Sequence, residues 1–243
     1  MGEGMAAGAL PSYRDTGQRV QRAMYPPTPM GLGALRLRYS IEQARCLRGD
    51  LVDYFVLAEH YACFYVADVS RLGPTSAFVP VLLKNLSRRL RREYRRSMLD
   101  APEEALAWFQ QGLGSYGITE PVSMFLGIAP LRGEIFRYAA VGSTPLALLA
   151  TPRGRFVLDA TSDQSTEIPG NSAQALQSRP APLAPGDALA VFTGPATDSA
   201  NSHHAVVREA LLSPAASFAE QWQALLPSGE LDCDRTALFV ERV

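Results

Sequence analysis

The sequence has the length and composition of a folded domain. Its 243 residues are 47% hydrophobic and 19% charged, which allows a large core and excludes a disordered chain. The net charge of −1 argues against general nucleic-acid binding, which needs a basic excess. No apolar run approaches the roughly twenty residues of a membrane span. The three cysteines, Cys46, Cys63 and Cys233, are far apart without a C-x-x-C spacing, so a reducing cytoplasm is favoured over a disulfide framework or thiolate zinc site.

The first half of the chain predicts helices around one strand pair. Residues 1–11 are rich in Gly and Ala and predict a flexible tail, so one domain is expected at residues 12–243. The expected elements are a helix at 12–24, a strand at 35–39, strands at 53–58 and 61–69 that turn at Glu59 and His60, and helices at 75–94 and 101–113. In the helix at 75–94, helical spacing predicts a buried face, with Thr75 or Ser76 as the cap; this face comprises Phe78, Val81, Leu82, Leu86 and Leu90.

The second half predicts mostly strands. They are expected at 123–128, 134–141, 146–150, 155–159, 188–193 and 236–242, with a long loop at 165–185 and helices at 204–212 and 217–226. Hairpins beside two consecutive helices predict antiparallel sheets covered by helices rather than a doubly wound parallel sheet.

Five segments, in order, carry a resemblance to a known family. They are residues 21–29, which resemble a Q-x-x-L-x-P entry; 49–55, which resemble G-G-D-x-x-D-x-F; 67–73, which resemble A-D-V-S-G-H-G; 185–195, which resemble P-G-D before a strand ending T-D-G; and 232–236, which resemble D-D-x-T. Each motif is weak alone, but five at sensible spacings form a strong signal. The chain resembles the SpoIIE/RsbU branch of the metal-dependent protein phosphatases over residues 18–243. Residues 76–84 look most like phosphatase domains attached to response regulators.

The resemblance implies both a fold and an activity. The fold is α+β, a four-layer α-β-β-α sandwich of two antiparallel sheets flanked by helices. Family members bind two Mn²⁺ or Mg²⁺ ions at one edge and hydrolyse phosphoserine or phosphothreonine on small regulatory proteins. Such hard cations prefer carboxylate oxygens, and a metal pair can activate water while neutralising phosphoryl oxygens.

The resemblance places residual metal ligands in the retained motifs. Asp50 and Asp68 match the aspartates of the first two phosphatase motifs, and Val69 would offer its backbone carbonyl. Asp234 is the substitute carboxylate in the last motif, with Asp232 as an alternative. We expect Asp50 and Asp68 to meet at one edge on neighbouring strands. A simpler role competes for both, because aspartates also satisfy backbone donors at strand ends.

Four positions depart from the family pattern. Gly194 stands where T-D-G has its aspartate, and Cys233 where D-D-x-T has its usual ligand; a thiol is a soft ligand that suits Mn²⁺ or Mg²⁺ poorly. Arg48 and Arg71 replace glycines that permit close backbone approach or positive φ. Arg71 also offers a guanidinium that could replace a lost cation beside Asp68. We therefore expect a degenerate site with no cofactor, or with Mn²⁺ or Mg²⁺ if part of the site survives.

The resulting hypothesis is a pseudophosphatase that binds a regulatory protein in bacterial partner switching. The implied partners are an anti-sigma-factor antagonist, a sigma factor or a response-regulator pathway component. Four arginines of the run at 87–96 are the predicted dock for an acidic partner: Arg88, Arg91, Arg92 and Arg95. The simpler reading of that run is a solvated helix face. Two alternatives stay open: an active Mn²⁺- or Mg²⁺-dependent serine/threonine phosphatase acting on a small phosphorylated regulator, and a scaffold that forms homodimers.

Overall fold

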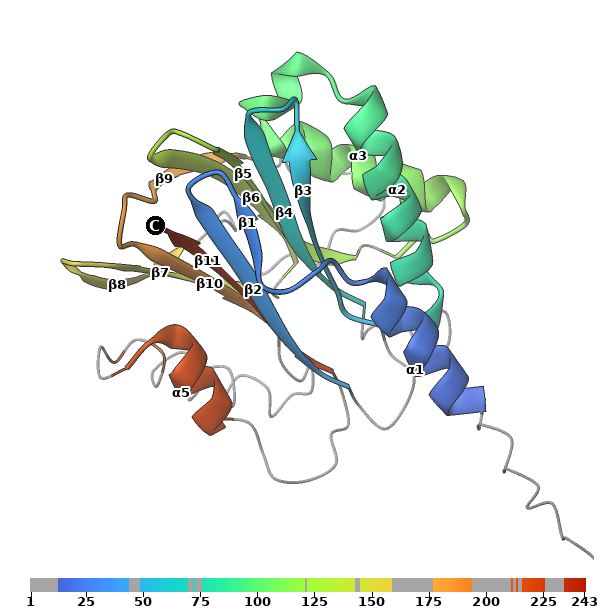
Figure 1. Ribbon diagram of the computed structural model, residues 1–243. Helices are drawn as coiled ribbons and strands as arrows, with labels where there is room; N and C mark the ends of the chain where they lie inside the picture. The colour runs from blue at the N-terminus through green and yellow to red at the C-terminus, as the bar shows by residue number, and fades with distance from the viewer. Residues whose placement is uncertain are drawn as a thin grey trace, which may run out of the picture.

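Two antiparallel sheets lie face to face between layers of helix (Figure 1). The computed structural model describes residues 13–43, 49–69, 72, 76–120, 122–142, 145–158, 177–193, 211, 213, 216–225 and 234–243. Within these residues, one sheet has the strand order β3-β4-β5-β6-β9 and the other has β1-β2-β11-β10-β7-β8. The expected α-β-β-α sandwich is therefore confirmed. No helix in the described residues is long and apolar enough to cross a membrane.

The first sheet is covered by helices on its outer face. Its strands are β3 (Leu51–Leu57), β4 (Tyr61–Asp68), β5 (Ser123–Pro130), β6 (Ile135–Val141) and β9 (Arg179–Pro182). Over it lie α2 (Val79–Glu93), the 3₁₀ helix η2 (Arg96–Leu99) and α3 (Pro102–Ser115). The buried side chains of Leu86 and Phe109 pack with Tyr65 of β4 in this layer, so apolar burial fixes the helices on the sheet.

The second sheet closes the sandwich. Its strands are β1 (Met30–Leu32), β2 (Leu35–Glu42), β7 (Leu146–Thr151), β8 (Gly154–Leu158), β10 (Ala188–Phe192) and β11 (Arg235–Arg242). A second core between the sheets includes Phe64, Leu189 and Leu238. On the outer face, Trp222 of α5 (Phe218–Leu225) packs against Phe192, with ring centroids 5.7 Å apart. This sheet therefore contributes to two separate cores.

The β3–β4 hairpin sets the position of the acidic motifs. Leu51 pairs with Ala67 at one end and Leu57 with Tyr61 at the other. Ala58 and Glu59 in the turn have φ of 52° and 62°, an uncommon conformation for residues other than glycine. Because the pairing is continuous, the residues just outside the first pair, Asp50 and Asp68, are carried to the same end of the hairpin.

The helix predicted at 75–94 differs from the prediction at its start. It begins at Val79 with Phe78 at the N-cap position, and no side chain caps it, so Ser76 does not have the expected role; Thr75 lies outside the described residues. Pro80 fixes the first turn, as prolines often do.

The buried face of α2 is also rotated from the predicted one. Phe78 and Val81 are 70% and 46% exposed, whereas Val79 and Leu83 are buried with Leu86 and Leu90. Once the helix begins at Val79, those four residues follow the helical period and face the sheet.

Two short strands were absent from the prediction. β9 lies in the segment expected to be a loop and pairs with β6 at the sheet edge, where its prolines need not donate to a further strand. β1 pairs with β2 over three residues. The helix expected at 204–212 lies outside the described residues except for position 211, so it stays a prediction. α1 (Tyr13–Met24) forms where a helix was expected and contacts α2.

Candidate functional site

Three buried aspartates meet at one edge of the sandwich. Asp50 precedes β3 and Asp68 ends β4, so the hairpin register places them side by side. Asp234 precedes β11 in the other sheet, and its Oδ2 accepts a hydrogen bond of 3.2 Å from the Asp50 backbone N–H. All three are 5% exposed or less. The predicted juxtaposition of Asp50 and Asp68 is therefore present, and Asp234 joins it from the opposite sheet.

Thr193 links the Asp50 carboxylate to the second sheet. It follows β10, and its Oγ1 donates to Asp50 Oδ2 at 2.6 Å. The same oxygen accepts from the Thr236 backbone N–H at 3.2 Å. Tyr25 donates from its hydroxyl to the Asp50 backbone carbonyl at 3.2 Å. Asp50 is thus tied to both sheets and to the segment that follows α1.

The aspartates make this edge unfavourable for further negative charge. Burial raises the Asp50 pKa well above its usual value, the charges of Asp68 and Asp234 raise it further, and the Thr193 hydrogen bond acts the other way. The Tyr25 pKa is raised by burial and by the charges of Asp234 and Asp50. The edge would therefore attract a cation.

A second buried aspartate of the same motif contacts a helix instead. Asp53 lies on β3, and its Oδ1 accepts from Lys84 Nζ of α2 at 2.6 Å and from the Tyr54 backbone N–H at 3.0 Å. Nearby, Tyr65 and Ser87 share a hydrogen bond of 2.8 Å between their hydroxyls. Burial raises the Asp53 pKa, while the Lys84 charge opposes the shift. These contacts hold α2 on the sheet.

The sequence model for Stage II sporulation protein E (SpoIIE) matches residues 58–240, most of the chain. The chain belongs to the SpoIIE family. No curated protein matches the sequence significantly.

Solved structures similar to this SpoIIE-family chain include two described as PP2C domains. The RsbU and RsbW domains of a Mycobacterium tuberculosis protein share 20% identity at a TM-score of 0.64, covering 86% of this chain and 61% of that one. The SiaA PP2C domain of Pseudomonas aeruginosa shares 15% at 0.64, covering 93% of each. The SpoIIE phosphatase domain of Bacillus subtilis, with a fragment of its regulatory domain, shares 15% at 0.62, covering 85% and 63%.

At these identities the likeness shows a common fold. The chain spans less than two thirds of the first and third of these structures. The chain is therefore a SpoIIE-family domain with the fold of these PP2C domains.

The donor chemistry of the SpoIIE-family edge suits Mn²⁺ or Mg²⁺, but its described residues do not form a complete site. Carboxylates are the right ligands for such ions. Within the described ranges, however, no three or more His, Cys, Asp or Glu side chains are arranged to hold a metal. The Val69 carbonyl, a predicted ligand, accepts from the Leu72 backbone N–H at 3.1 Å. The described residues therefore do not fit a two-metal centre, and we derive no catalytic step through one.

The four departures from the family pattern lie outside the described residues: Arg48, Arg71, Gly194 and Cys233. Their expected effects stay predictions. The Asp53–Lys84 ion pair was not anticipated, although the sequence held a signal. A lone lysine on a leucine-rich helix face and a lone aspartate in an apolar strand are each costly to bury unless they find a partner.

The arginines of the predicted dock are exposed on or just beyond α2. Arg91 also lies over the Phe55 ring, with its guanidinium carbon 5.8 Å from the centroid. The neighbouring Arg89 differs, because it pairs with Glu93 at 3.0 Å and lies 5.6 Å from the Trp108 ring centroid. Arg88, Arg91, Arg92 and Arg95 are thus accessible to a partner, and their binding role stays a prediction.

Proposed function

We propose that this SpoIIE-family domain works by binding a regulatory protein and has lost efficient phosphatase chemistry. One observation carries the proposal: the retained carboxylates are bonded within the protein. Thr193 holds the Asp50 carboxylate at 2.6 Å, and Asp234 holds the Asp50 backbone N–H at 3.2 Å. A strand-end aspartate bonded in this way connects the two sheets, which is a structural role.

The sequence supports the same proposal independently. Gly194 and Cys233 remove two carboxylates from the family's ligand set. The affinity of a hard-cation site depends on its number of charged ligands, so losing two should weaken binding greatly. We therefore expect neither Mn²⁺ nor Mg²⁺ to be bound tightly.

The decisive experiment is a Mn²⁺ titration paired with a phosphatase assay on a phosphoserine peptide. The proposal predicts weak Mn²⁺ binding and no Mn²⁺-dependent turnover above that of Asp68→Ala. Turnover that Asp68→Ala abolishes would overturn it. The triple variant Gly194→Asp, Cys233→Asp, Arg71→Gly should gain Mn²⁺ affinity, because it restores both carboxylates and a glycine.

An active metal-dependent serine/threonine phosphatase is the second candidate. The negative charges of Asp68 and Asp234 beside the buried Asp50 carboxyl favour it, because they would attract a cation to this edge. Its substrate would be a small phosphorylated regulator. The same titration and assay decide between the two candidates.

The proposed partner is a regulatory protein with an acidic face. It would be an anti-sigma-factor antagonist, a sigma factor or a response-regulator pathway component, acting in the cytoplasm. One similar solved structure contains an RsbU and an RsbW domain in the same protein, which is in keeping with a protein partner. The exposed arginines of α2 would steer this partner.

The docking proposal is tested by association kinetics. With a candidate partner, reversing Arg91 and Arg92 to Glu should slow association and flatten its salt dependence, because exposed interface charges act mainly on the on-rate. Arg153→Glu, on the exposed β7–β8 turn, is the matched control. Equal association rates for the wild type and the α2 variant would indicate that the arginine run is only a solvated helix face. Self-association without any such partner would favour the homodimeric scaffold.

A further inference from the structure

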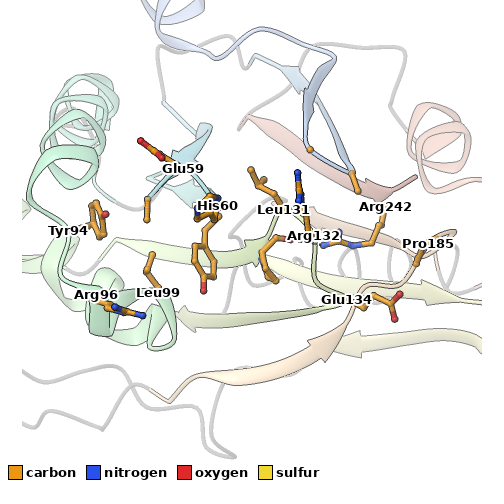
Figure 2. Close-up of a pocket in the computed structure, with 15 residues that line it drawn as sticks. Glu59, His60, Tyr94, Arg96, Leu99, Leu131, Arg132, Glu134, Pro185 and Arg242 are labelled. Carbon is orange, nitrogen blue, oxygen red and sulfur yellow. Dashed lines mark hydrogen bonds between the residues drawn. The ribbon is translucent and has the colours of Figure 1, made fainter.

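A cavity lies at the end of the β3–β4 hairpin opposite the three aspartates. Its volume is about 1090 Å³. It forms where the β1–β2, β3–β4 and β5–β6 turns, η2, the entry to β10 and the end of β11 meet. Figure 2 shows Arg132 and Arg242 on one side of it, Tyr94, Arg96 and Leu99 on the other, and His60 between them.

The walls of this cavity are joined by backbone hydrogen bonds. Leu131 N–H donates to the His60 carbonyl at 2.8 Å, and Ala34 N–H donates to the Leu131 carbonyl at 3.3 Å. Val243 N–H, directly after β11, donates to the Ala34 carbonyl at 2.9 Å. Three turns and a strand end are therefore fixed to one another, so the cavity is preformed.

Arg242 is a buried cation whose hydrogen-bonding capacity is incompletely used. It is 3% exposed and lines the cavity. Its Nη2 donates to the Pro130 carbonyl at 3.0 Å, whereas its Nε has no acceptor among the described residues. A guanidinium carries five N–H donors and stays charged in proteins. Burying that charge without a close counter-ion is costly, so an anion beside it would be stabilised.

The other charged side chains that line the cavity are Arg96, Arg132, Glu59 and Glu134, so the buried Arg242 is the excess positive charge. Arg132 is exposed on the Arg242 side, and Arg96 lies across the opening. Glu59 and Glu134 also line the cavity but are exposed, so solvent and salt weaken their charges. Burial lowers the Arg242 pKa and the Glu134 charge acts the other way, which places Glu134 within electrostatic range but leaves the buried charge positive.

We propose that this cavity binds a small organic anion, whose carboxylate or phosphate contacts Arg242 and Arg132 while its apolar body lies toward Leu99 and Tyr94. The cavity volume lies just above the roughly 300–1,000 Å³ typical of small-molecule sites. The apolar wall and the buried arginine together match an anion with an attached ring or chain better than a bare ion. This site is separate from the aspartate edge and does not depend on its metal content.

The test is titration calorimetry with phenyl phosphate, benzoate and inorganic phosphate. Phenyl phosphate or benzoate should bind saturably, and inorganic phosphate at least about tenfold more weakly, because it lacks the apolar body. Comparing the two organic anions distinguishes a phosphate from a carboxylate ligand. Arg132→Gln and Arg242→Gln should each weaken binding at least about tenfold, which corresponds to one charge-assisted hydrogen bond. Arg153→Gln removes a distant exposed charge and should change nothing.

Arg132 is exposed, so its variant keeps the test valid if Arg242→Gln does not fold. Backbone amide shifts locate the ligand, and they should move at Ala58 and His60 but not at Asp50. Absence of saturable binding by either organic anion to the wild type would overturn the proposal, as would binding that neither arginine variant weakens. Binding of a glutamate-rich peptide in place of the small anions would also overturn it and would indicate a protein ligand.

Discussion

Asp50 and Asp53 lie three positions apart, and both are buried, but they belong to different parts of the molecule. Asp50 lies at the sheet–sheet side, where it receives a hydrogen bond from Thr193 and is close to two other carboxylates. Asp53 lies at the helix side, where Lys84 approaches it to 2.6 Å. Because successive strand residues alternate between faces, an odd separation places them on opposite sides of the sheet.

The motif at residues 49–55 therefore serves two purposes. The Asp53–Lys84 pair neutralises a buried charge and joins β3 to α2. At Asp50 the neighbouring charges have the same sign, so ionisation is opposed. The Lys84 charge stabilises the ionised form of Asp53 in the folded protein. At Asp50, ionisation lowers the stability of the fold unless a cation binds beside it.

The largest expected effect is on the paired aspartate. Lys84→Met should lower the free energy of unfolding by about 3 kcal/mol, because it leaves a buried carboxylate without its partner. We place the loss at the low end for such pairs, since Lys84 is 21% exposed and Asp53 can take up a proton. Urea unfolding measures the change. Arg92→Met, exposed on the same helix, should stay within about 0.5 kcal/mol; equal losses in the two variants would show that the ion pair contributes nothing.

The opposite sign is expected at Asp50, whose charged neighbours are carboxylates. Asp50→Asn keeps an acceptor for Thr193 and removes charge repulsion, so it should raise Tm at neutral pH by about 2–4 °C, as about 1 kcal/mol does in a chain of this size. The raised Asp50 pKa means that its contribution to stability is present at low pH and lost as pH rises through the raised value.

Calorimetry should therefore show that the gain from Asp50→Asn grows as pH rises above the ordinary aspartate pKa of about 4. Asp100→Asn, an exposed carboxylate, is the control and should give no such trend. A gain independent of pH would mean that repulsion at Asp50 is not its cause.

Arg91 should make a smaller contribution to stability on the helix side of the first sheet, where the Asp53–Lys84 pair lies. Arg91→Gln should cost about 0.5–1 kcal/mol through loss of its contact with the Phe55 ring on β3. Arg88→Gln, on the same helix, lacks a ring contact in the described residues and should be neutral. Thermal unfolding of both variants checks the difference, and an equal cost would assign it to helix charge in general.

The smallest expected effect is that of Mn²⁺ on the edge formed by Asp50, Asp68 and Asp234. If the site is degenerate, with a dissociation constant of about 1 mM or more, then about 1 mM Mn²⁺ stabilises the fold by at most about 0.4 kcal/mol. The Tm of the wild type should then rise by less than about 2 °C. A larger rise that disappears in Asp50→Asn would identify Asp50 as a working metal ligand.

Motifs and alternation predicted the features that depend on local sequence. The sandwich and the meeting of Asp50 with Asp68 followed from strand pairs and motif order. The start of α2 was wrong because a favourable cap residue, Ser76, competes with Pro80, whose ring sets the first helical turn further on. β9 was missed because a proline-rich strand has no sequence signal of its own and depends on β6 for pairing.

The contacts that define the two aspartate environments could not be predicted in the same way. Thr193 lies 143 positions from Asp50 in the sequence and contacts it from the other sheet. Lys84 contacts Asp53 from the helix layer that covers the first sheet. Side-chain pairs of this kind depend on how sheets and helices stack, which periodicity does not encode.

The β3–β4 hairpin imposes a parity rule on the acidic motifs. Asp50 and Asp68 lie side by side because the paired positions between them are in continuous register. One residue inserted within either strand would carry one aspartate to the helix side of the sheet, whereas two would return it to the same side. Changes of strand length in this hairpin thus divide into even ones, which keep both aspartates on the sheet–sheet side, and odd ones, which place them on opposite sides of the sheet.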